Sequence, residues 1–201
     1  MNIIANNCCG GWLYTHNKME YTNPFMWSIT QYDSLIYLLG HFYDINWTNI
    51  KISESALRKH TYKITVDGMV NIHYMHCVFN KDKTQPTKIF RKNIGNDIDY
   101  CLIWEYVYDK YIARTKRMIK NGEPPIFLLR PNNGNCNWTD EQINTLLTLP
   151  TPFKRILISQ NQAISSDNSN NLILYTTDYP SHSCIIQKYL SDINRFIGLE
   201  Q

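Results

Sequence analysis

The second half of the chain alternates short apolar runs with longer amphipathic segments, and this alternation limits the fold more than any other feature. Three runs are apolar and β-branched enough to be buried strands: 126–130, 153–159 and 171–176. Amphipathic helices are predicted around them, at 97–120, from Thr139 to about Leu147 and at 185–197. Strands that alternate with helices favour an α/β fold with a largely parallel sheet, because parallel strands need a long crossover between them.

The first half of the chain adds a hairpin to this pattern. Asp67-Gly68 lies between two alternating runs within 62–79, and this dipeptide tolerates the positive φ angles of a tight turn. The other predicted elements are a strand at 2–5, a helix from about Cys8 to Met19, a helix at 32–42 opened by Thr30 or Asp33, and a helical turn or two at 53–59. We therefore expect one domain over 1–201, a layered α/β/α fold with a mixed, mostly parallel sheet and one antiparallel hairpin.

Composition excludes several classes of protein. A chain of 201 residues with 43% hydrophobic and 13% aromatic residues can form a core, so it is not intrinsically disordered. A net charge of +3 without a dense Lys/Arg run argues against a nucleic-acid partner. No apolar segment reaches the ~18 residues of a membrane span, and the N-terminus does not read as a signal peptide.

The six cysteines contain no C-x-x-C pair, so we expect reduced thiols in a cytoplasmic setting, that of the host or the virion if the source is viral. No cluster has metal-ligand spacing, and we expect neither a metal nor another cofactor. The oligomeric state is not predicted. Heavy use of Asn, Ile, Tyr and Lys is typical of an AT-rich genome.

The strongest candidate for chemistry is the segment Asn7-Cys8-Cys9-Gly10-Gly11. It joins a short buried strand to the predicted first turn of a helix, where backbone N–H groups and the helix dipole favour thiolate over thiol. We take Cys8 as the candidate nucleophile and the N–H groups near Cys9 and Gly10 as candidate oxyanion donors. The alternative is a small buried Cys beside a glycine turn.

A histidine on the returning hairpin strand could supply the base. His76 ends an apolar strand face, and its pKa could therefore be moved near neutrality, as a general base requires. His73 points to the other face and is a candidate substrate contact. A core histidine bonded to a backbone carbonyl is the competing interpretation for His76.

Three further residues are candidate substrate contacts. Phe25 and Trp27 follow Pro24 and offer flat surfaces for a cleft, although they could equally fill the core. Arg130 directly follows a predicted buried strand and could pair with an anionic group of a substrate.

Asn7-Cys8 after a short strand, followed by Asn-Pro-Phe-Met-Trp at 23–27, resembles a family of bacterial and viral proteins described as papain-like cysteine peptidases. The His-bearing strand and the basic helix before the strand that ends in Arg130 are similar as well. The family motif has Pro-Phe-Asp-Trp, whereas this chain has Met26 in place of the Asp. The resemblance implies Cys8 as nucleophile, His76 as base and a downstream orienting residue. It also implies a papain-like α+β fold as an alternative.

For the orienting residue we choose Asn132, with Asp82 behind it. The string at 7–11 and Ile-His-Tyr-Met-His at 72–76 are also similar to an uncharacterised family of exopolysaccharide or capsule biosynthesis proteins.

Three functional hypotheses follow. The first is a thiol-dependent hydrolase or acyl transferase that acts on a peptide or acyl substrate through Cys8 and His76. The second is a polysaccharide biosynthesis protein that binds a sugar or sugar phosphate through Phe25, Trp27 and Arg130. The third is an interaction domain with no chemistry.

Overall fold

The computed structural model describes residues 1–57, 61–74, 100–131, 138–166, 168–177 and 181–199, with the backbone alone at Glu54 and 100–107. The strands are β1 (Asn2–Ala5), β2 (Ser28–Thr30), β3 (Ile50–Glu54), β4 (Tyr62–Val66), β5 (Val70–Tyr74), β6 (Pro125–Leu129), β7 (Lys154–Ser159) and β8 (Asn171–Tyr175). The helices are α1 (Cys9–His16), α2 (Tyr32–His41), α3 (Tyr100–Asn121), α4 (Asp140–Thr148), α5 (His182–Lys188) and α6 (Leu190–Ile197).

A parallel sheet with the strand order β1-β6-β7-β8 forms the centre of the molecule. Its register pairs Ile4 with Phe127, and Leu128 with Ile156. Strands β1, β6 and β7 are buried on both faces, as is usual in a parallel sheet, which explains their continuous apolar runs. Strand β8, at the edge of the sheet, was predicted to be buried but is mostly half-buried. The predicted α/β fold is confirmed.

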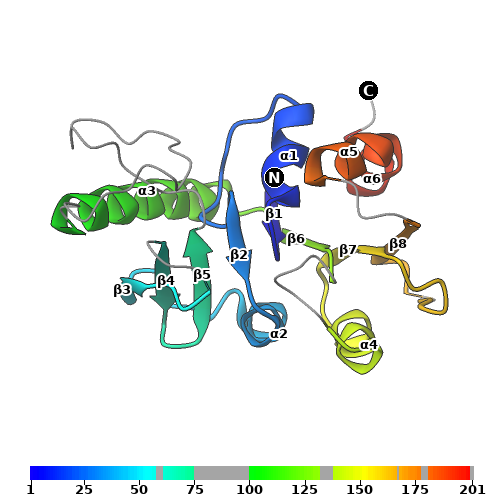
Figure 1. Cartoon of the computed structure of the whole chain (residues 1–201), viewed down its shortest axis with the longest axis horizontal. Helices are drawn as coiled ribbons and strands as arrows, with labels where there is room; N and C mark the ends of the chain where they lie inside the picture. The colour runs from blue at the N-terminus through cyan, green and yellow to red at the C-terminus, as the bar shows by residue number, and fades with distance from the viewer. Residues whose placement is uncertain (58–60, 75–99, 132–137, 167, 178–180, 200–201) are drawn as a thin grey trace.

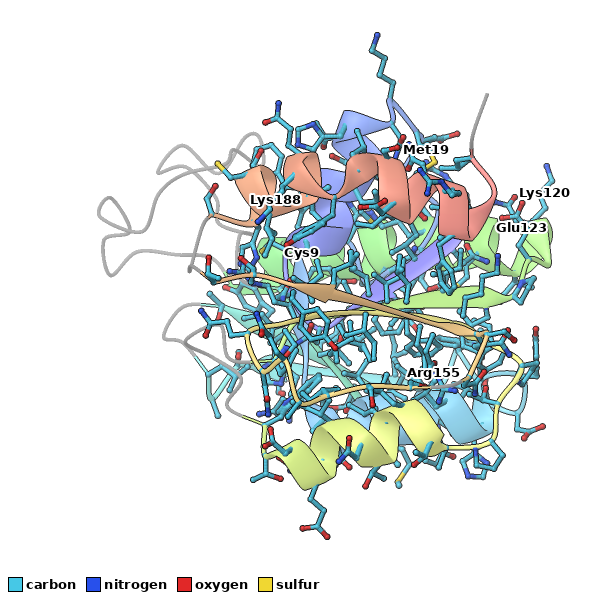
Figure 2. The ribbon with its side chains drawn as sticks, turned by 90° about the vertical axis from the view of Figure 1, so that its right-hand side faces the viewer. Cys9, Met19, Lys120, Glu123, Arg155 and Lys188 are labelled. Carbon is cyan, nitrogen blue, oxygen red and sulfur yellow. The ribbon has the colours of Figure 1, made fainter. Side chains whose placement is uncertain are left out.

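Helices cover both faces of this sheet (Figure 1). Side chains alternate along a strand, so Ile3 and Ala5 pack in one cluster with residues of α1, α5 and α6. Ile4 points to the opposite face and belongs to a cluster that includes residues of α2 and α4. Arg155 on β7 is fully buried and donates to the carbonyl oxygens of Leu146 and Leu149 at 2.7 and 2.9 Å, which satisfies carbonyls at the end of α4. Figure 2 shows Arg155 on the α4 side of the sheet.

The hairpin belongs to a second sheet, which is antiparallel and has the order β2-β5-β4-β3. Asp67 and Gly68 have φ angles of 51° and 74°, as the predicted tight turn requires. The chain therefore has two sheets, where we expected one mixed sheet with the hairpin at its edge. The reason is that the hairpin pairs with β2 and β3, two strands that the sequence analysis did not predict.

Several local predictions need correction. Ser53 belongs to β3, which pairs with β4 in place of the expected helical turn at 53–59. The residue that precedes α2 is Gln31, not Thr30 or Asp33. The closing helix is two helices that meet at Tyr189, whose φ and ψ of −107° and 13° leave the helical region.

Helix α3 begins and ends near the predicted limits of 97 and 120. In the part of the chain that the structure describes, no helix has both the length and the apolar character needed to cross a membrane.

Candidate functional site

The candidate site lies at the carboxyl ends of the parallel strands, where open α/β sheets bind their ligands. Strand β1 ends at Ala5 and leads through Asn6 to Cys9, and β6 ends at Leu129 and is followed by Arg130. Strand β8 is followed, after a connection, by His182 at the start of α5. Three chain segments that are far apart in sequence thus meet at one edge of the sheet.

Two asparagines build the end of β1. The Asn6 side chain accepts from the Arg130 N–H at 2.7 Å and donates to the Arg130 carbonyl at 2.9 Å, so it extends the pairing of β1 and β6 by one step. The Asn7 side chain accepts from the Cys9 N–H at 2.9 Å and donates to Asn6 at 3.1 Å. Both asparagines are buried, and together they fix the positions of Cys9 and Arg130.

Helix α1 approaches the strand closely because its first turn contains two glycines. A Cβ at Gly10 would lie 3.0 Å from the Ala5 Cβ, and a Cβ at Gly11 would lie 2.6 Å from ring atoms of Trp27. The second distance is shorter than any real contact, so Gly11 is required for the Trp27 ring to pack on the helix.

Cys9, His182 and Arg130 meet at this edge. The Cys9 Sγ lies 3.1 Å from His182 Nδ1, and Arg130 Nη1 lies 2.9 Å from the same nitrogen. Cys9 is fully buried, Arg130 is 5% exposed and His182 is half-buried. Figure 2 shows Cys9 between α5 and the strands beneath it. A second contact between the same two helices, Ser183 Oγ to His16 Nε2 at 3.3 Å, supports this packing.

The contact with Arg130 determines which ring nitrogen of His182 carries the proton. A guanidinium N–H can only donate, so His182 Nδ1 must accept and the ring hydrogen must be on Nε2. The Cys9 thiol, also within reach of Nδ1, is then a donor to the same nitrogen. The resting arrangement is therefore a neutral imidazole that faces a protonated thiol and a guanidinium.

Burial decides the ionisation of both neighbouring thiols. It raises the pKa of Cys9 to about 12, since a thiolate would lose its hydration, although the charge and hydrogen bond of Arg130 act in the opposite direction. Burial likewise raises the pKa of Cys8 to about 11. Neither sulfur is a preformed thiolate at neutral pH, so the dipole of α1 does not have the effect that the sequence predicted.

The contact between Cys9 and His182 is an alternative to the predicted catalytic set of Cys8, His76 and Asn132, which the described residues do not test. Cys8 is half-buried and precedes α1, and Cys9, one residue later, contacts His182. His76, Asn132 and Asp82 lie outside the described residues, so their predicted roles stay predictions. The Cys9 N–H, a predicted oxyanion donor, is donated to Asn7. The role of the Gly10 N–H, within the first turn of α1, as an oxyanion donor stays a prediction.

The predicted substrate contacts have different surroundings. Phe25 is 1% exposed and packs edge-on against Trp47, so its ring belongs to the core. Trp27 is half-buried and contacts Trp12 at 5.4 Å between ring centroids.

His73 lies in the antiparallel sheet, where its Nδ1 bonds to Ser55 Oγ at 2.7 Å. Burial, with the charge of Lys63, lowers the pKa of His73 to about 4. Arg130, the remaining predicted contact, lies beside Cys9, since both side chains reach His182 Nδ1.

Sequence analysis missed His182. One local feature could have pointed to it, namely a Ser at the start of a helix that follows the last strand of the sheet. The Ser181 side chain accepts a hydrogen bond from the Cys184 N–H and so caps the helix that begins at His182. Its partner, however, is 173 positions away in the chain.

No group of three or more His, Cys, Asp or Glu side chains within the described ranges could hold a metal ion. In the comparisons with known proteins, no family model matches this chain, and no curated protein matches it either.

Proposed function

We propose that this chain is a thiol-dependent hydrolase or acyl transferase in which Cys9 is the nucleophile and His182 the general base. The observation that carries the proposal is the 3.1 Å contact between Cys9 Sγ and His182 Nδ1. A cysteine nucleophile needs a base within hydrogen-bond reach, and this pair meets that requirement. The position at the carboxyl edge of a parallel sheet agrees with it.

The reaction would proceed in two half-reactions. Cys9 Sγ attacks the carbonyl carbon of the substrate while its proton moves to His182 Nδ1, which gives a tetrahedral oxyanion. Collapse of this intermediate breaks the bond to the leaving group, which takes the proton from His182, and leaves a thioester on Cys9. Water or an acceptor nucleophile then releases the acyl group and restores the thiol.

The buried state of Cys9 determines the kind of catalysis. With a pKa of about 12, Cys9 rests as a thiol, so the proton must be removed as the C–S bond forms and not beforehand. The sulfur is also fully covered, and α5 contributes to that cover through His182.

The experiment is acylation with p-nitrophenyl acetate, followed by mass mapping of the modified residue. The proposal predicts a burst of p-nitrophenolate and an acetyl thioester on Cys9, both lost in Cys9→Ser. Two variants serve as matched controls, Cys8→Ser at the neighbouring thiol and Cys184→Ser at an exposed thiol, and both should keep the burst. A burst that survives in Cys9→Ser, or that disappears in Cys8→Ser, contradicts the assignment.

The glycan-binding alternative is less well supported. One of its three residues, Phe25, is in the core and offers no surface to a sugar. It would also leave the contact between Cys9 and His182 without a role.

A further inference from the structure

Arg130 and Cys9 compete for one nitrogen. Arg130 Nη1 is 2.9 Å from His182 Nδ1, and the Cys9 sulfur is 3.1 Å from it. A neutral imidazole has a single lone pair, and in His182 both donors converge on it.

This arrangement opposes the transfer of a proton to His182. If the Cys9 proton moved to Nδ1, the new N–H would face the Arg130 N–H at a distance where both are donors and one is already cationic. His182 is a stronger base when the guanidinium turns away from Nδ1. A neutral ester should therefore react slowly, and a substrate group that draws Arg130 away should speed the reaction.

We propose that the substrate carries an anionic oxygen group, such as a carboxylate, next to its electrophilic carbon, and that this group takes the hydrogen bond of Arg130 and so frees His182 Nδ1. The inference rests on the proposed function, since it assumes that Cys9 attacks and His182 receives the proton.

The surroundings of Arg130 suit this role. Its backbone is fixed by the Asn6 side chain on both the N–H and the carbonyl, so only the side chain needs to move. The residue is almost fully buried, and hydrogen bonds between a guanidinium and a carboxylate are strong and directional in such surroundings. Because Arg130 Nη1 and the Cys9 sulfur lie 2.9 and 3.1 Å from the same nitrogen, an anion that Arg130 binds would lie beside the nucleophile.

Two alkylating reagents that differ mainly in charge test this inference in the native chain. Iodoacetate is anionic and iodoacetamide neutral. With either one a C–S bond forms at the thiol, the C–I bond breaks, iodide leaves and the thiol proton is released. Like-charge repulsion makes an ordinary thiolate react more slowly with iodoacetate. The exposed thiol of Cys184 in the same chain supplies this ordinary ratio of rates.

The expected result is a ratio of iodoacetate to iodoacetamide rates that is about tenfold or more higher at Cys9 than at Cys184, measured by mass mapping of the two adducts. Arg130→Gln should bring the Cys9 ratio down to that of Cys184, and Arg130→Lys should retain part of the preference. If the Arg130 variants do not fold, a competition experiment on the unmodified chain gives the same information. Acetate, which does not react with thiols, should lower the rate of Cys9 alkylation by iodoacetate more than the rate of its alkylation by iodoacetamide.

Each contrary outcome has a distinct meaning. If Cys9 reacts with iodoacetamide in a His182-dependent way but shows the same ratio as Cys184, the anionic substrate is refuted and the proposed function stands. If Cys9 reacts with neither reagent while Cys184 reacts with both, the proposed function and the inference are both refuted.

Discussion

Replacement of Asn6 by Ala tests how the candidate site is built. Asn6 is 0% exposed, and its amide bonds to the N–H and the carbonyl of Arg130 as well as to the Asn7 side chain. In Asn6→Ala the Arg130 N–H loses its acceptor, while the carbonyl keeps a longer contact of 3.3 Å to Asn7.

The magnitude follows from these bonds. A buried donor left without its partner costs roughly 1–3 kcal/mol, and the weakened carbonyl and the small cavity add on the order of 1 kcal/mol. We expect Asn6→Ala to lower the free energy of unfolding by about 2–4 kcal/mol. For a chain of this length that corresponds to roughly 4–16 °C in Tm.

The assay is urea unfolding followed by circular dichroism, at constant m-value. Asn17→Ala is the control, because Asn17 and Asn194 exchange side-chain hydrogen bonds of 3.1 and 2.8 Å. Asn17 is half-buried, so water can replace the lost partner, and the free energy of unfolding should fall by less than about 1 kcal/mol. Equal losses in the two variants would refute the idea that Asn6 joins β1 to Arg130.

Two further predictions concern the glycines and the buried histidine. Gly11→Ala should lower stability by about 1–2 kcal/mol, because the new Cβ would lie 2.6 Å from the Trp27 ring. Gly40→Ala should raise stability by up to about 1 kcal/mol, because nothing lies within 4 Å of the new Cβ and Ala favours a helix. Thermal melts of the two variants in parallel check this, and equal shifts in Tm would contradict it. His73 has a folded pKa of about 4, below the ordinary 6.5, so the unfolded chain binds the extra proton and stability should fall as pH falls from about 6.5 to 4. His73→Gln should flatten this part of a stability–pH curve, and an unchanged slope would mean that another group causes it.

The parts of the fold that follow from local rules could be predicted from the sequence. The Asp67-Gly68 turn depends on positive φ angles, which this dipeptide tolerates. The capping box of α4 pairs Thr139 with Gln142, three residues apart, and both hydrogen bonds are present. Strand β2 could not be predicted in the same way, because three residues carry too little pattern and its pairing with β5 is a long-range choice.

The candidate site could not be predicted in full, because it depends on contacts between distant segments and on the residue at which α1 begins. Neighbouring positions on a helix differ by about 100°, so the start of α1 at Cys9 sets the direction in which the Cys9 thiol points toward His182. The partner of that thiol comes from α5, and no local sequence pattern connects two segments that far apart. Arg130 could be predicted as part of the site because the end of a buried strand can be seen in the sequence itself.

The central claim is that His182 receives the proton of Cys9, and the rate of Cys9 acylation as a function of pH tests it most directly. In the native chain the rate should be nearly constant between pH 7 and 9, whereas in His182→Gln it should be roughly 10²–10⁴ lower at pH 7. It should also rise tenfold per pH unit in that variant, as expected for a thiol with a pKa of about 12. Equal rates and equal slopes in the two proteins would contradict the claim.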